Sequence, residues 1–439
     1  ILISLFFFVL QEEATYFNIK LRLNDTSFVR SGFCNDYNFA AIKNKTTTDM
    51  KKNFFIIAFM LVLVSCTKKQ QLLETAETHE IELNACVDET PIYFCKNSLA
   101  EEFGDMELIA LENNSENPMG EILKMQVSDS GIFILDSQQG GSIFHYASDG
   151  RFISRIGEKG HSRSEYSGIL NFSVNTAGDT IAILDYNYVK LYNSEGNFLD
   201  DFSMKDTPQW QGFLLTDRGC FLSTNNRGQK TVLARYSNNF KSEDPLIKGQ
   251  VNLIRDMPPS WQNQLQRDGE NICYYDYYTS SLYVFNTGDL SKSKRYALVS
   301  PNALTESKAR EAGLKSCEYD HLESFVYEDS TIWGIYKYGE SLYDFKLDVQ
   351  TDSCRLNHHM DKGYSFLCTH NGWYYYAFEP VQLLQLIGLD KYRMPAIGRL
   401  LKKVLKPYEE TMKETDNYYI LKVRRKKGEY KSNMTKVCQ

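Results

Sequence analysis

Two sets of polar residues in this chain have the types and spacing for ligand binding. Asp136 and Asp185 end two matching apolar runs, so their carboxylates could line a shared binding site. The same positions suit a structural role, because Asp side chains readily accept backbone hydrogen bonds in turns. The second set lies on one polar loop and comprises Arg155, His161, Glu165 and Tyr166. A polar loop with an aromatic residue suits sugar or peptide binding, although ordinary connections have the same composition.

The sequence contains none of the common catalytic signatures, so we assign no catalytic residue, no metal ligand and no cofactor. The segment from Gly160 to Ser164 comes nearest to a G-x-S-x-G elbow, and it lacks the final glycine. There is no P-loop, H-E-x-x-H or G-x-G-x-x-G motif. The pair His358 and His359, with Asp361, could form the edge of a metal site. Neighbouring residues of a strand point to opposite faces, however, which disfavours that interpretation.

Ten cysteines are present, and none of them forms a C-x-x-C pair. After Cys34 and Cys66 are set aside, eight remain, at positions 86, 95, 220, 273, 317, 354, 368 and 438. In an oxidising compartment some of them could form disulfides, with Cys86 and Cys95 the closest in sequence. Buried free thiols are an equally good interpretation.

The segment from Met50 to Cys66 has the organisation of a secretory signal. Two lysines follow Met50, about a dozen apolar residues come next, and the segment ends Leu-Val-Ser-Cys. This ending resembles the bacterial lipobox, and the resemblance implies that Cys66 carries lipid and becomes the first residue of the mature chain. Several acyl chains anchor a protein firmly. We therefore expect the membrane to be a partner of this protein through Cys66.

These features divide the chain into five expected segments. Residues 1–49 are interpreted as translated upstream sequence, 50–66 as the signal peptide with lipobox, and 67–80 as a polar tether. Residues 81–427 form the main domain and 428–439 a polar tail. The residue after Cys66 is not Asp, which in the sorting rule implied by the resemblance permits delivery to the outer membrane. We favour its periplasmic face, with surface exposure as the alternative.

The main domain repeats one pattern of short apolar runs and acidic-Gly turns. The first copy comprises residues 131–136, 142–146 and 149–153, and the second comprises 180–185, 188–192 and 195–199. Weaker copies span 219–236, 271–285 and 331–345, and a last one begins at Gly372. Acidic-Gly dipeptides supply the positive φ that tight hairpins require. The pattern predicts strands joined by hairpins, in six similar units.

Six units of this period predict an all-β, six-bladed β-propeller with four-stranded antiparallel blades. Closing such a ring usually joins strands from both ends of the chain in one blade, and we expect residues 107–111 and 418–423 to complete the ring. Two short helical insertions are predicted, at 305–314 and at 395–405. The second has apolar residues on one face, so we expect it to pack against the propeller.

Two stretches resemble a known family. The run from Asp149 to Gly157, followed by Gly160 and by Glu165-Tyr166, resembles the "DGkf…iG…G…gEy" stretch of six-bladed β-propeller lipoproteins, which are related to NHL-repeat and TolB-like propellers. Residues 416–421 resemble that family's "dNPvlv" ending, with Tyr418 where proline is usual. The resemblance covers residues 80 to 427. It implies a propeller in the envelope of a Gram-negative cell, and it implies little about activity because propellers have many functions.

Composition and motifs together favour a binding protein over an enzyme. The formal net charge is -7, which argues against nucleic acid as a partner because such binding needs a basic face. We expect an envelope-anchored lipoprotein that binds a glycan, a peptide or another envelope protein. The alternative is a polysaccharide lyase or glycoside hydrolase with its site at the mouth of the central channel. That alternative requires carboxylates, or histidines and a metal, to converge there.

Overall fold

A computed structural model describes residues 73, 75–88, 103–113, 118–137, 141–204, 210–224, 230–237, 239–240, 243–249, 264–304, 308, 319–358, 366–388 and 396–426. The chain divides into two units, residues 1–70 and 71–439, and all the described residues belong to the second. The signal segment with Cys66, the expected helix at 305–314 apart from residue 308, and the tail at 428–439 lie outside the described residues. In the part of the chain that is described, no helix is both long enough and apolar enough to cross a membrane.

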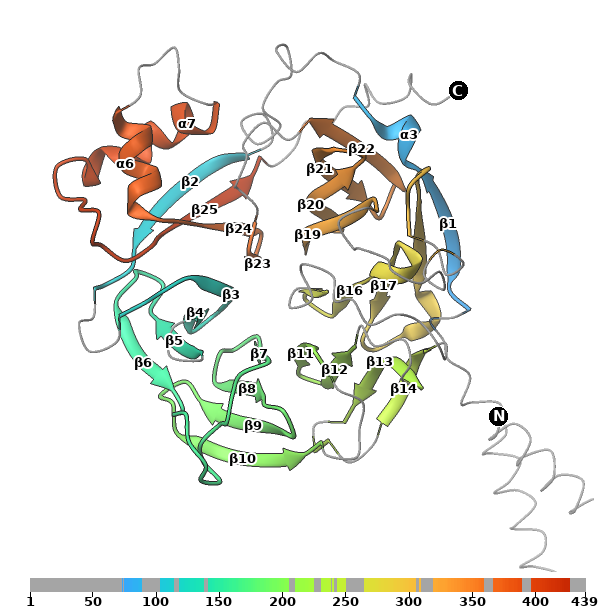
Figure 1. Ribbon diagram of the computed structural model, residues 1–439, viewed down its shortest axis with the longest axis horizontal. Coiled ribbons are helices and arrows are strands. Elements are labelled where there is room, and N and C mark those ends of the chain that lie inside the picture. The colour runs from blue at the N-terminus through green and yellow to red at the C-terminus, as the bar shows by residue number, and fades with distance from the viewer. Residues whose placement is uncertain are drawn as a thin grey trace, which may run out of the picture. The chain divides into compact units, whose positions relative to one another are not determined.

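The described residues form six sheets arranged in a ring, each with four antiparallel strands, so the prediction of a six-bladed propeller is confirmed (Figure 1). Blade 1 contains β3 (Ile122–Ser128), β4 (Gly131–Asp136), β5 (Ser142–Tyr146) and β6 (Phe152–Ile156). Blade 2 contains β7 (Asn171–Val174), β8 (Thr180–Leu184), β9 (Tyr188–Asn193) and β10 (Phe198–Ser203). Blade 3 contains β11 (Gly212–Thr216), β12 (Gly219–Ser223), β13 (Thr231–Tyr236) and β14 (Glu243–Lys248).

The other three blades follow the same order from the channel outward. Blade 4 contains β15 (Leu265–Asp268), β16 (Asn271–Asp276), β17 (Ser281–Asn286) and β18 (Lys294–Val299). Blade 5 contains β19 (His321–Glu328), β20 (Thr331–Tyr338), β21 (Ser341–Asp348) and β22 (Ser353–His358). Blade 6 contains β23 (Cys368–His370), β24 (Trp373–Phe378), β25 (Tyr419–Arg425) and β2 (Phe103–Ala110).

Blade 6 closes the ring with strands from both ends of the domain, as the sequence predicts. β2 pairs antiparallel with β25, and Leu108 lies opposite Leu421. Residues more than 300 positions apart thus share one sheet, and β2 covers the outer edge of β25. Figure 1 shows this joint, with β2 beside β25.

Alternating residues of each strand pack against the blades on either side. On β4, Ile132 and Ile134 belong to an apolar cluster shared with blade 6, whereas Phe133 and Leu135 belong to one shared with blade 2. This follows from strand geometry, because successive side chains point to opposite faces. It also explains why β4 is buried along its whole length. A single blade could not bury both of its faces.

Helices occur where a blade needs extra cover. α6 (Pro380–Gly388) and α7 (Ala396–Leu405) lie between β24 and β25, next to β2 (Figure 1). Leu401 and Leu405 of α7 are buried in an apolar cluster with residues of blade 6, so the expected helix is confirmed. The sequence analysis missed α6. Short helical turns are α3 (Leu83–Cys86), η4 (Tyr277–Thr279), η5 (Leu290–Lys292) and η7 (Lys406–Tyr408).

Blade 4 has a fifth strand that the sequence did not predict. β1 (Glu77–Glu82) pairs parallel with β18, with Ile81 opposite Leu298. This strand begins inside the range expected as a tether. Only Ile81 of its six residues is buried, which left a weak sequence signal.

Candidate functional site

The innermost strands of the six blades surround the centre of the ring. Each of them contacts the innermost strand of both neighbouring blades. One edge of each innermost strand pairs with the second strand of its own blade, and the other edge faces the neighbours. Backbone groups on that free edge need partners, because a buried N–H or C=O without a hydrogen bond is costly.

Polar side chains on the innermost strands satisfy many of these groups and connect the blades. Gln126 Oε1 of blade 1 accepts from Val174 N of blade 2 at 2.8 Å. Ser173 Oγ accepts from Leu215 N of blade 3 at 2.8 Å. Arg267 of blade 4 donates to Leu215 O at 2.9 Å and reaches on to Val174 O at 3.4 Å. Gln126 and Arg267 both line the centre of the ring, and both are engaged in holding the blades together.

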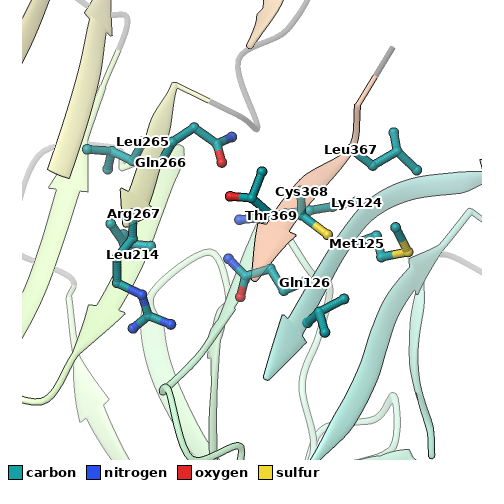
Figure 2. A pocket seen from close by; sticks show the side chains of 11 residues that line it. Lys124, Met125, Gln126, Leu214, Leu265, Gln266, Arg267, Leu367, Cys368 and Thr369 are labelled. Carbon is teal, nitrogen blue, oxygen red and sulfur yellow. The ribbon is translucent and has the colours of Figure 1, made fainter. Parts of the chain in front are cut away.

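Lys124 on β3 is the most deeply buried cation of this region. Its Nζ donates to Asn171 Oδ1 at 2.7 Å and to Phe172 O at 2.9 Å, both in blade 2. Burial lowers its pKa to about 7, because removal from water disfavours the charged form. Figure 2 shows Lys124 beside Cys368 at the side of a central cavity of about 450 Å³, counting space open to solvent. Residues of β3, β11, β15 and β23 line this cavity, on opposite sides of the ring.

A second cavity lies where blade 6 meets blade 1, and we call it the closing pocket. It measures about 550 Å³, again counting space open to solvent. The polar side chains that line it include Asp129, His370, Asn371, Tyr375 and Lys422.

The turns after two innermost strands place three polar side chains together in the closing pocket. Asp129 follows β3 in blade 1, whereas His370 ends β23 in blade 6 and Asn371 follows it. His370 Nε2 lies 3.0 Å from Asp129 Oδ1 and 3.0 Å from Asn371 Nδ2, and Asn371 Nδ2 donates to Asp129 Oδ1 at 3.2 Å. Burial lowers the pKa of His370, while the hydrogen bond to Asp129 opposes that shift. The three residues offer a carboxylate, an imidazole and an amide side by side.

Lys422, which also lines the closing pocket, belongs to a set of charged and aromatic side chains on blade 6. Lys422 on β25 forms an ion pair with Glu107 at 2.6 Å, and its Nζ lies 4.7 Å from the centre of the Trp373 ring. Arg424 approaches the same ring to 4.4 Å and donates to Asn371 O at 3.3 Å. Cation–π contacts of this kind stabilise both partners. This set therefore ties the Asn371 turn to strand β25.

The family model described as "Domain of unknown function (DUF4934)" matches residues 79–424, which is nearly the whole propeller. The chain belongs to this family. No curated protein matches it.

Among solved structures, this DUF4934 protein is similar to a putative exported protein from Bacteroides fragilis. The TM-score is 0.59 at 14% identity, over 80% of this chain and 99% of that one. This chain is also similar to a member of the DUF4221 family from Bacteroides vulgatus, with a TM-score of 0.44 at 9% identity, over 74% of this chain and 97% of that one. At such identities the first likeness shows a shared fold.

The two aspartates singled out in the sequence of this DUF4934 protein are buried and bind backbone. Asp136, at the end of β4, accepts from Gly120 N at 2.5 Å. Asp185 accepts from Ser167 N at 3.0 Å, from Ser167 Oγ at 2.6 Å and from Tyr186 N at 2.7 Å. Each side chain thus connects the loop after the second strand of its blade to the loop before the first strand of the same blade. A role in ligand binding stays a prediction for them.

The loop with His161 and Glu165 lies at the outer side of blades 1 and 2. Glu165 accepts from Ser162 N at 2.9 Å, and this contact lowers the pKa of the exposed carboxyl. The buried Tyr166 packs in the cluster shared by blades 1 and 2, whereas His161 is exposed. Arg155 lies on β6, the outermost strand of blade 1. The structure does not bring these four residues into the closing pocket, and their part in ligand binding stays a prediction.

The sequence analysis missed Asp129, His370 and Asn371. A usable signal existed, because the two turns occupy equivalent places in their repeats. Asp129 and Ser130 come directly before Gly131, which opens β4, and His370 and Asn371 come directly before Gly372, which precedes β24. Their proximity, however, depends on ring closure between the first and last blades. For metal binding, no group of three His, Cys, Asp or Glu residues is close enough within the described ranges. His358 packs against the Tyr343 ring at 4.7 Å, and His359 and Asp361 lie outside those ranges.

Proposed function

We propose that this DUF4934 protein is an envelope lipoprotein, anchored through Cys66, whose propeller binds a glycan, a peptide or a protein without altering it. The signal-like segment from Met50 to Cys66 supports the anchor and an outer-membrane location. The stretch at 149–166 supports kinship with NHL-repeat and TolB-like propellers. The likeness to a putative exported protein is consistent with a place outside the cytoplasm.

The observation that carries the binding role is the closing pocket. It presents the Asp129, His370 and Asn371 groups together on one wall, and Tyr375 and Lys422 line it as well. A concave site with convergent polar groups and aromatic surface is typical of ligand recognition. In the centre of the ring, Lys124, Gln126 and Arg267 each bond to backbone groups of a neighbouring blade. We therefore place the ligand at the closing pocket, on the face where the Asp129 and Asn371 turns lie.

A matched pair of histidine variants tests this placement. The wild-type protein is screened against immobilised envelope polysaccharides and peptides, and each ligand found is then measured with His370→Ala and His161→Ala. We expect at least about a tenfold loss of affinity for His370→Ala, because truncating a residue at the centre of a site commonly removes over 1.4 kcal/mol. His161→Ala should bind as the wild type does.

The opposite pattern would move the ligand site to the outer loop and would refute the closing pocket. Thermal unfolding of both variants serves as the control, because His370 also joins blade 6 to blade 1. If the melting temperature of His370→Ala falls, Asp129→Asn gives a second measurement at the same wall, because it removes the charge and keeps the shape of the side chain.

Intact-mass analysis of protein from its native membrane fraction tests the anchor. We expect a chain that begins at Cys66 and carries additional acyl mass, which base treatment reduces. A chain that retains residues 1–49, or one without lipid, would contradict the anchored state.

One observation favours the second candidate, a polysaccharide lyase or glycoside hydrolase. Burial raises the pKa of Glu328 to about 7, and the nearby Asp268 charge adds to this effect. A carboxyl protonated near neutral pH can act as a general acid. Glu328 Oε1, however, already accepts from Gly372 N at 2.6 Å, and neither carboxylate lines the two cavities described above. Release of new sugar ends from a bound polysaccharide, abolished by Glu328→Gln, would support this candidate.

A further inference from the structure

The first described segment of the domain runs along the outer side of two blades, and we call residues 75–88 the strap. Its strand β1 lies against β18 of blade 4. After α3, the strap reaches blade 5, where Val87 bridges Leu356 of β22. Figure 1 shows β1 and α3 at the outside of the ring, with α3 next to β22.

Direct contacts hold the end of the strap on β22. Asp88 N donates to Leu356 O at 2.8 Å, and the Asp88 carboxylate pairs with Arg355 at 3.0 Å. Leu83 of α3 is fully buried in the apolar cluster of blades 4 and 5. Tyr338 of blade 5 donates to Asn84 Oδ1 at 2.5 Å. The strap therefore has a defined position on blade 5.

Two cysteines lie at this contact. Cys86 ends α3 directly before Val87, and Cys354 lies on β22 two residues before Leu356, the residue that Val87 bridges. Both also pack against the same apolar cluster, and Cys86 Sγ lies 3.3 Å from Glu82 O. The other three described cysteines are buried singly, on β12, β16 and β23 of three different blades. Both cysteines thus lie where the strap meets β22, and each affects the pKa of the other, as a pair close enough for a disulfide would.

We propose that Cys86 and Cys354 form a disulfide bond that joins the strap covalently to blade 5. The oxidant is an external disulfide, either a small molecule or a protein. One Cys86 thiol, one Cys354 thiol and one oxidant disulfide give one Cys86–Cys354 disulfide and two released thiols. The two electrons pass to the oxidant, and both thiol protons leave with the released thiols.

The surroundings of the pair define the order of these steps. The hydrogen bond from Cys354 lowers the pKa of Cys86, although burial opposes it, so Cys86 is the readier thiolate. The hydrogen bond to Cys86, together with burial, raises the pKa of the Cys354 thiol. Cys86, the less buried of the two, attacks the oxidant first and forms a mixed disulfide. Cys354 then loses its proton and displaces the second thiol.

Peptide mapping of the full chain tests the proposal directly. The folded protein is incubated with oxidised glutathione, free thiols are alkylated, and the chain is cut with trypsin and Glu-C without reduction. Glu89 lies between Cys86 and Cys95, so Glu-C separates these two cysteines. We expect a linked pair of peptides that contain Cys86 and Cys354, lost on reduction. Complete alkylation of both cysteines, or a link from Cys86 to Cys95, would overturn the proposal.

Two serine variants provide a second and independent measurement. Oxidation should raise the melting temperature of the wild type by several degrees, since a disulfide that closes a long loop restricts the unfolded chain. Cys95→Ser should keep this shift, because it removes only the rival partner. Cys354→Ser should lose it. Equal behaviour of the two variants would count against the Cys86–Cys354 bond.

Discussion

Lys124 is a residue whose chemistry is determined by the ring around it. In sequence it stands in an ordinary strand, Ile-Leu-Lys-Met-Gln-Val, and nothing marks it as unusual. In the ring its Nζ is enclosed by blade 2 and donates to two oxygens there. Burial lowers its pKa to about 7, from 10.5 for an exposed lysine. Sequence analysis missed this residue because its burial depends on the neighbouring blade.

Replacing Lys124 by Met should remove one specific dependence of stability on pH. Between pH 7 and pH 10.5 the unfolded chain binds more protons at this residue than the folded chain does. The free energy of unfolding must therefore rise with pH in this window, by at most about 1.4 kcal/mol per pH unit. Below pH 7 both states carry the charge, and this contribution to the pH dependence disappears. The variant cannot gain stability in this way.

Urea denaturation of wild type and Lys124→Met at several pH values measures this contribution. In the difference between the two free energies of unfolding, the contributions of cysteines and tyrosines that titrate in the same pH window cancel. We expect the free energy of unfolding of the wild type, relative to that of the variant, to rise by about 2 to 3 kcal/mol between about pH 7 and about pH 9. A constant difference would mean that Lys124 keeps an ordinary pKa.

At the scale of elements, the acidic-Gly turns hold neighbouring blades together. Gly150 and Gly196 occupy the same place in blades 1 and 2, with φ of +91° and +88°. A Cβ at Gly150 would lie 2.1 Å from Ala110 O, and one at Gly196 would lie 2.2 Å from Arg155 O. Each turn thus packs directly on the outermost strand of the preceding blade. The sequence predicted the positive φ of these turns, and the structure adds this second requirement.

Gly196→Ala should destabilise the protein more than a matched glycine variant does. Gly269 also has positive φ, +56°, but no atom lies within 4 Å of its missing Cβ. Gly269→Ala should therefore cost only about 1 kcal/mol, the strain of a left-handed alanine. Gly196→Ala should cost about 2 kcal/mol more, because Arg155 and its strand must move. Denaturant midpoints measure both, and equal midpoints would contradict the packing role of the turn.

The repeat made most of the elements predictable, and the elements outside the repeat were harder. The six blades, the closing strands β2 and β25 and helix α7 follow from apolar periodicity, which is strong where both faces are buried. β1 covers only one edge of blade 4, so its residues are mostly polar and exposed. The closing pocket was not predictable, because Asp129 and His370 are 241 residues apart and meet only through ring closure.

At the scale of the whole ring, each blade depends on its neighbours for burial and for hydrogen bonds. Lys124 joins blade 1 to blade 2, Thr369 of blade 6 donates to Tyr327 O of blade 5 at 3.1 Å, and His370 joins blade 6 to blade 1. The apolar clusters likewise span neighbouring blades. A blade that opened alone would expose one face of each neighbour. We therefore expect the described propeller to unfold as one unit.

Two leucine variants on different blades test this cooperativity. Leu421 of the closing strand β25 and Leu222 of β12 in blade 3 are both fully buried. Replacing either with Ala should reduce the free energy of unfolding by about 2 to 5 kcal/mol. In a cooperative ring, each variant should accelerate hydrogen exchange in the most protected strands of all six blades, as global unfolding becomes more frequent. Mass spectrometry of exchange resolves the blades separately. Acceleration confined to blade 6 in Leu421→Ala and to blade 3 in Leu222→Ala would show that the blades open independently. The closing strands would then secure one joint of the ring without coupling its blades.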